Sequence, residues 1–217
     1  MLFNSIEFIF AFLPITFFGY WLALRHAPFL ATTWLAIASL FFYSWWDISS
    51  LPILLVSVAF NYSAGSYIGE KQKKKPHISK SILVFSIAIN LVALGYYKYF
   101  SFLAGEFLTA FDIAIDKPIS IALPIGISFF TFTQIAYLVD VYRGVARESR
   151  PANYMLFVSY FPHLIAGPIL HHKEMMPQFR DINKAIVNRE RIADGAGIFL
   201  IGLAKKLLIA DPLGFYA

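Results

Sequence analysis

Hydrophobic stretches without charge, separated by short polar segments, run through most of this chain. The hydrocarbon core of a bilayer is about 30 Å thick and needs about 20 apolar residues in helical form. Five stretches come close to that length, residues 8–24, 27–46, 48–69, 81–97 and 118–139. The pattern therefore predicts an all-α fold, a polytopic membrane helical bundle with about five full spans.

Two further apolar segments are less regular. Pro162, Gly167 and Pro168 interrupt residues 151–170, and Lys205 interrupts residues 195–210 together with Lys206. Backbone groups have no water to bind inside a bilayer, so irregular backbone occurs there only where it is buried in protein or lines a cavity. The second segment is predicted to be an interfacial or spanning C-terminal helix, in which Lys205 lies on an amphipathic face or points into a polar cavity.

The charged residues between the stretches give a consistent orientation. Residues 70–80 carry a run of lysines, which the positive-inside rule places in the cytoplasm. Counting the spans from this point puts residues 101–117, which are mainly acidic, outside, and Arg143, Arg147 and Arg150 inside. The polar stretch after residue 170 is again basic. Residues 151–170 are therefore predicted to form a re-entrant hairpin that returns to the cytoplasm.

Composition agrees with a membrane protein. Apolar residues make up 59% of the 217 residues and charged residues 14%, whereas a soluble domain has about 25% charged residues. The chain has no cysteine, which excludes thiol nucleophiles and disulfides. The net charge of +5 is assigned to membrane topology, so membrane lipid is an expected partner and nucleic acid is not. No internal repeat or linker divides the chain, which predicts a single membrane domain over residues 1–217.

The most informative stretch is residues 160–179, YFPHLIAGPILHHKEMMPQF, where helix breaks and three histidines occur together. An ionisable group inside an apolar segment is expensive and is by default a functional candidate. His163 is either a base suited to acyl transfer or a histidine hydrogen-bonded to a carbonyl that the proline break leaves free. No nucleophile is visibly paired with it in the sequence.

His171, His172 and Glu174 offer metal-ligand chemistry, but adjacent positions on a helix point about 100° apart and do not share one face. No metal site is predicted. Beside Lys173, these residues are expected to lie at the membrane surface, as polar residues of the hairpin or as contacts for an anionic headgroup or a carrier.

Polar side chains also occur inside the predicted spans. Gln134 belongs to a polar track in residues 118–139 that serves either helix packing or the wall of a cavity. Asn61 and Asn90, in the third and fourth spans, are predicted to form hydrogen bonds between helices.

Six sequence blocks follow one another along the chain, FNSIEFIFAFLPITFFGYW, FFYSWWD, LGYYKYFSF, LPIGISFFTFTQIAYLVDVYRG, YFPHLIAGPILHHKEMMPQF and GLAKKLLIADPL. In this order they resemble the membrane-bound O-acyltransferase family, specifically the branch of bacterial alginate O-acetylases and related polysaccharide and peptidoglycan O-acetyltransferases. The resemblance spans the whole chain.

This resemblance implies a multi-spanning bundle in the bacterial cytoplasmic (inner) membrane with a passage for an acetyl group. An acyl donor such as acetyl coenzyme A would serve as substrate and not as a bound cofactor, and the acceptor would be a hydroxyl of an extracytoplasmic polysaccharide such as alginate or peptidoglycan, reached with accessory acetylation proteins. Re-entrant segments line the passage in this family. The residues expected to line or support it are Pro162, His163, Gly167, Pro168, His171, His172, Gln134 and Lys205.

The family's catalytic histidine belongs to a tryptophan- and histidine-containing block in the second half of its members, and no segment here matches that block. None of the five histidines occupies the matching position, so no catalytic residue is identified. The chain resembles an N-terminal half and is expected to be inactive alone. Two other functions stay open, a transporter-like module, because broken helices also build transport sites, and a scaffold subunit.

Overall fold

The computed structural model describes residues 2–110, 122–148, 150–164, 167, 172–180 and 189–214, and all regular structure within these ranges is helical. Four helical segments in them are long and apolar enough to cross a membrane: Phe8–His26, Phe29–Trp46, Ile48–Lys71 and Pro76–Phe100. These observations confirm the all-α membrane class. The chain divides by its internal contacts into two units, residues 32–179 and residues 1–31 with 180–217.

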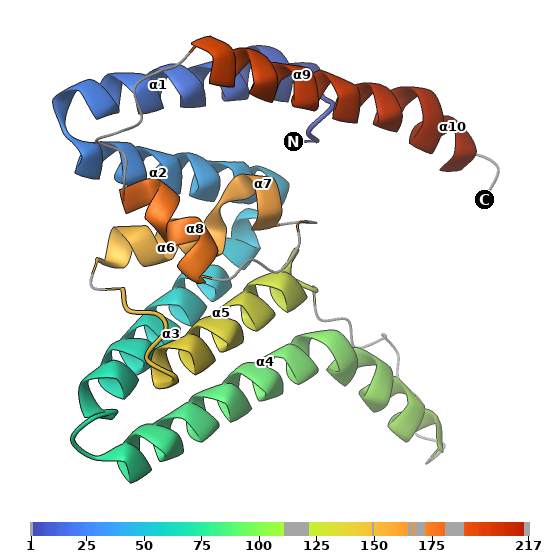
Figure 1. Cartoon of the computed structure of the whole chain (residues 1–217). Helices are drawn as coiled ribbons and strands as arrows, with labels where there is room; N and C mark the ends of the chain where they lie inside the picture. Colours follow the sequence, from blue (N-terminus) through green and yellow to red (C-terminus); the bar gives the residue numbers. More distant parts are fainter. Residues whose placement is uncertain are drawn as a thin grey trace. The chain divides into compact units, whose positions relative to one another are not determined.

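The unit that contains both termini is built from a helix at each end of the chain. The π-helix η1 (Phe8–Phe12) continues into α1 (Leu13–His26), and α9 (Arg189–Lys205) continues through η4 (Lys206–Ala210) into α10 (Asp211–Gly214) (Figure 1). The rings of Phe8 and Phe199 lie with centroids 6.5 Å apart. Lys205 is exposed at the end of α9, and Lys206 forms an ion pair with Asp211 at 2.9 Å. Whether this helix spans a membrane or lies at its surface stays a prediction.

The other unit holds α2 (Pro28–Trp46) from Thr32 onward, η2 (Ile48–Ser50), α3 (Leu51–Lys71), α4 (Pro76–Ala110), α5 (Ile127–Tyr142), α6 (Pro151–Ser159), α7 (Phe161–Leu164) and α8 (His172–Arg180). Helices α3 and α4 form an antiparallel hairpin across a lysine-rich turn, and α5 packs against both (Figure 1). Buried apolar side chains fill the space between them, among them Leu54, Val58, Leu83, Leu94, Phe130, Leu138 and Phe157.

Polar pairs and close approaches join these helices. The amides of Asn61 and Asn90 donate to each other's oxygen at 3.0 and 2.7 Å, which confirms the predicted bond between α3 and α4. Gly65 lets α5 come close, because a Cβ at this position would lie 2.6 Å from the Tyr137 ring. Small and paired polar residues of this kind are the usual contacts between membrane helices.

The fifth predicted span is shorter than the sequence suggested. Helix α5 begins only at Ile127, because Gly126 has a left-handed φ of 73° and Pro124 precedes it outside the helix. Its 16 residues rise about 24 Å, less than the about 30 Å of a hydrocarbon core. The expectation of five full spans is therefore not met by the described residues, which show four.

The predicted break in residues 151–170 is present, although it falls at a different residue. Helix α6 ends at Ser159, Tyr160 has ψ of 111°, and the four-residue helix α7 follows with Pro162 in its first turn. Gly167 folds back onto this turn, since a Cβ there would lie 2.4 Å from the Cβ of His163. The described residues do not show a return to the cytoplasm, and Pro168 and His171 lie outside them.

Candidate functional site

A row of buried polar side chains connects α3, α5 and α6. The Gln134 amide donates to the Ser57 hydroxyl at 2.9 Å, and the Tyr154 hydroxyl donates to the Gln134 carbonyl oxygen at 3.3 Å. Gln134 is fully buried. Of the two readings of its polar track, the structure therefore shows helix packing at this residue.

The row continues through aromatic rings to His172. The Tyr137 ring lies 4.6 Å from that of Tyr154 and 5.2 Å from that of His172, and Phe157 meets His172 edge-on at 5.2 Å. Two predicted site residues that are distant in the sequence, Gln134 and His172, are thus linked through the side chains of Tyr154 and Tyr137.

His172 is only 3% exposed, so the expectation that it lies at the surface was wrong. It begins α8 and shares one face with Met175 and Met176, which are also buried, because positions i, i+3 and i+4 of a helix are neighbours. Lys173 and Glu174 lie on the opposite, exposed face. The spacing of the histidine and the two methionines was the signal that indicated burial.

Glu148 is the functional candidate that the sequence did not reveal. Its carboxylate is buried in the loop between α5 and α6, and one oxygen lies 3.6 Å from Nε2 of His172. The other oxygen accepts hydrogen bonds from the Asn153 amide at 3.3 Å and from the backbone N–H of Arg150 at 3.1 Å. Its position just before a helix that starts with Pro151 was the available signal, since carboxylates favour helix N-termini.

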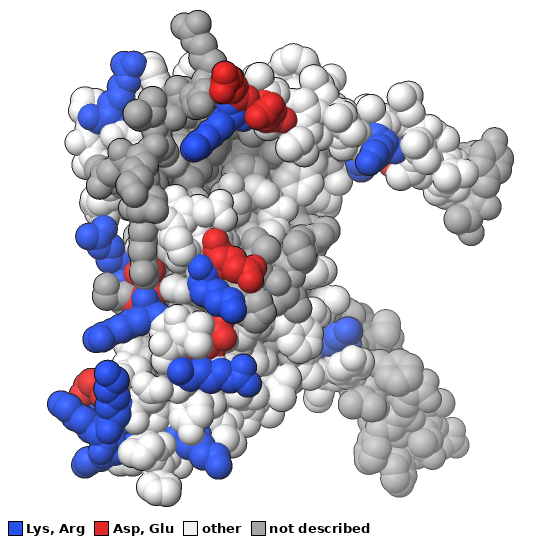
Figure 2. Space-filling model, in the orientation of Figure 1, with Lys and Arg blue, Asp and Glu red and all other residues white. Residues whose placement is uncertain are grey.

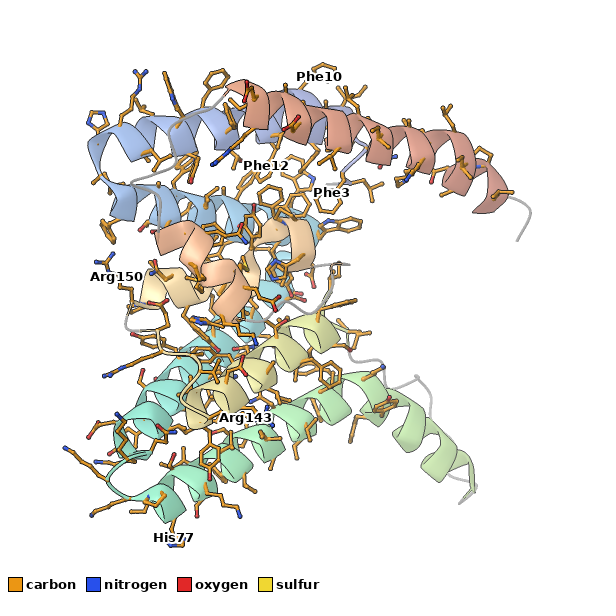
Figure 3. The ribbon with its side chains drawn as sticks, in the orientation of Figure 1. Phe3, Phe10, Phe12, His77, Arg143 and Arg150 are labelled. Atoms are coloured by element: carbon orange, nitrogen blue, oxygen red, sulfur yellow. The ribbon has the colours of Figure 1, made fainter. Side chains whose placement is uncertain are left out.

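A cavity of about 240 Å³ borders Glu148. It lies between the ends of α3 and α5 and is lined by Tyr62, Gly65, Ser66, Gly69, Tyr137, Val141, Arg147 and Glu148. Lys and Arg side chains gather over the adjoining α3–α4 turn (Figure 2), and Arg143 and Arg150 lie at the two ends of the loop between α5 and α6 (Figure 3). The positive-inside rule predicts that this end of the unit faces the cytoplasm.

His163 lies in α7 and is 7% exposed, with the centroid of its ring 5.8 Å from that of Tyr160. Neither ring nitrogen meets the full geometry of a hydrogen bond to a described residue, but the ring lies near the backbone of Phe157. Both interpretations of this histidine therefore stay predictions. Pro162 is exposed, and Lys205 belongs to the other unit. Within the described ranges no three acidic, histidine or cysteine side chains are grouped to hold a metal ion.

The chemistry available at this site is that of a paired acid and base. A histidine held by a carboxylate can accept or donate a proton if a reacting group comes within hydrogen-bond reach. His172 and Glu148 have this relation in a buried position, and Glu148 borders a cavity.

Curated relatives match the chain from end to end. A peptidoglycan O-acetyltransferase of Helicobacter pylori is 41% identical over 100% of the chain and 46% of its own length. Probable alginate O-acetylases AlgI of Pseudomonas aeruginosa and Azotobacter vinelandii are each 36% identical, over 100% and 98% of the chain and 41% and 42% of their own lengths. The chain therefore spans less than half the length of these relatives.

No family model matches the chain, and no solved structure is similar to it. The evidence of homology is the sequence identity to these acetylases along the whole chain. The chain is thus homologous over its full length to a peptidoglycan O-acetyltransferase and to probable alginate O-acetylases.

Proposed function

We propose that the chain is part of a membrane O-acetyltransferase that transfers acetyl groups from a cytoplasmic donor to hydroxyls of an extracytoplasmic polysaccharide such as peptidoglycan or alginate. The observation that carries this proposal is the identity of 41% to a peptidoglycan O-acetyltransferase and of 36% to a probable alginate O-acetylase, each across all of the chain.

The same protein is proposed to lie in the bacterial cytoplasmic membrane with a re-entrant hairpin at residues 151–170 and a fifth crossing that includes α5. Four candidate spans, the basic α3–α4 turn and the break between α6 and α7 support this topology. The predicted passage residues in the hairpin, Pro162, His163, Gly167 and Pro168, would then face the path of the acetyl group.

Acetyl coenzyme A or another acyl donor acts as substrate in this proposal, and accessory acetylation proteins deliver the polysaccharide. The transfer breaks the bond between the acyl carbon and its carrier and forms an ester with the acceptor oxygen, so the acceptor hydroxyl has to lose a proton. None of the five histidines of this chain stands where the family resemblance puts the catalytic one. We therefore propose that this base belongs to a part of the enzyme beyond the present residues, and that these 217 residues expressed alone do not transfer acetyl groups.

Radiolabelled acetyl donor supplied to membrane vesicles tests the proposal. The vesicles would contain the 217-residue chain, the part of the H. pylori relative that this chain does not match, or both, with polysaccharide acceptor and accessory proteins present. Label in the polymer only when both polypeptides are present supports the proposal. Transfer by the chain alone would disprove the proposal that it is inactive by itself. If the two polypeptides co-purify and still transfer no acetyl group, the result would argue for a transporter-like or scaffold module.

A further inference from the structure

Glu148 and His172 lie close together but do not form a direct hydrogen bond. Their closest nitrogen and oxygen atoms are 3.6 Å apart, which is longer than a hydrogen bond between nitrogen and oxygen. Both side chains are almost fully buried, at 2% and 3% exposure. Nε2 of His172 makes no hydrogen bond to a described residue, and a buried polar atom in that state is costly for the folded protein.

Water is the ordinary partner of polar groups separated by this distance. The adjoining cavity of about 240 Å³ has room for several molecules, because a water occupies about 30 Å³ in the liquid. A buried water needs two to four polar partners. Four of the residues that line the cavity have side chains with polar oxygen atoms, Glu148, Ser66, Tyr62 and Tyr137.

Glu148 lines this cavity, whereas His172 is not among the lining residues and reaches it only through the carboxylate 3.6 Å away. We propose that water bound at the Glu148 side of the cavity bridges Glu148 and His172 and makes the pair a site for an exchangeable proton. The bridging water accepts from the ring N–H and donates to the carboxylate, so a proton passes between the ring and the cavity without movement of α8. The cavity adjoins the basic, cytoplasmic end of the unit, which sets the side from which protons arrive.

The helices and the loop around Glu148 and His172 carry other charged and titratable groups. Arg147 lies on the cavity wall beside Glu148, and Tyr62 and Tyr137 extend from α3 and α5. Tyr154 of α6 stacks behind Tyr137, and α8 carries Lys173 and Glu174 on its exposed face. This proposal does not depend on acetyl transfer, and its experiment tests it independently of the proposed function.

The experiment measures exchange of the His172 ring proton with water by NMR of ¹⁵N-histidine-labelled chain in lipid bilayers. His172→Gln identifies the signal among the five histidines. Gly69→Leu places an apolar side chain in the cavity wall, where a Cβ would meet only Val141 at 3.4 Å. Gly95→Leu is the matched control, since Gly95 lies in a helix with nothing within 4 Å of a Cβ.

We expect exchange in the wild type and in Gly95→Leu, and exchange slowed at least about tenfold in Gly69→Leu because the filled cavity no longer holds the bridging water. Glu148→Leu should abolish the exchange, whereas Glu148→Gln should keep it, since its amide oxygen still accepts from water. No exchange in the wild type, or equal exchange in Gly69→Leu and Gly95→Leu, would overturn the proposal. If Glu148→Leu does not fold, the two glycine variants and Glu148→Gln still decide it.

Discussion

The reciprocal amide pair of Asn61 and Asn90 gives a measurable test of how α3 and α4 are held together. Each amide donates once across the helix interface, at 3.0 and 2.7 Å. Each also donates to the carbonyl four residues earlier in its own helix, Asn61 to Ser57 at 3.0 Å and Asn90 to Ser86 at 2.8 Å. If one asparagine is removed, the other therefore loses both interhelical hydrogen bonds and keeps the hydrogen bond to the carbonyl of its own helix.

The expected energies follow from this geometry. A hydrogen bond between membrane helices contributes about 0.6 kcal/mol on average and at most about 1.7 kcal/mol. Two such bonds predict a coupling energy of about 1.2 kcal/mol between Asn61 and Asn90. Each single change to alanine should cost about 1–3 kcal/mol, because the remaining asparagine oxygen is left buried without a donor. The double change should cost less than the sum of the two single changes.

The assay is reversible unfolding of the four proteins, wild type, Asn61→Ala, Asn90→Ala and the double variant, in bicelles. Independent sites add within about 0.3–0.5 kcal/mol. Additivity within that limit would refute the reasoning, because it would mean that the two amides do not depend on each other. Ser63→Ala is a suitable control, since its hydroxyl is exposed on α3 and bonds only to Ala59 of the same helix at 2.8 Å.

Two further predictions concern a helix contact and a helix cap. Gly65→Ala should destabilise the chain by about 1–3 kcal/mol in the same unfolding assay, because its Cβ would lie 2.6 Å from the Tyr137 ring; Gly95→Ala, with open space around it, should be neutral or stabilising. At Asp47, hydrogen bonds from Ser49 hold the pKa of the carboxyl below its usual value. The stability that this cap contributes is therefore complete above the unfolded-state pKa of about 3.9 and is lost as pH falls through the lower folded-state pKa. Asp47→Asn should remove this part of the pH dependence of unfolding, and an unchanged profile would contradict the assignment.

The sequence predicted the helices well where apolar stretches were long and uniform. It located the first four spans and the interhelical hydrogen bonding of Asn61 and Asn90, because hydrophobic length and isolated amides are local signals; that the two bond to each other came from the structure. It overestimated the length of the fifth helix, since Pro124 and Gly126 precede α5 and do not belong to it. Hydropathy alone does not distinguish an apolar helix from an apolar turn followed by a shorter helix.

The site was harder to predict because its residues meet only through tertiary packing. Glu148 stands among arginines in a segment that looked like a surface loop, and no local pattern shows that it meets a histidine 24 positions away. His172 was assigned to the surface from its polar neighbours, although the two methionines three and four positions later share its buried face. Reading α8 by its periodicity would have corrected the burial of His172 but would not have found its partner.

Buried polar groups in the residue ranges that the structure describes fall into two kinds, and the difference bears on function. Gln134, Asn61 and Asn90 have partners on neighbouring helices, as the cost of an unpaired group in a membrane requires. Three of the four buried side-chain atoms without a hydrogen-bond partner belong to His163 and His172, on either side of Gly167. Native proteins keep few such atoms, and each calls for a water, an ion or a functional role. The helix break at Tyr160 and the two imidazoles therefore occur in the same stretch, the described part of residues 160–179, which is where we would look first for a function besides packing.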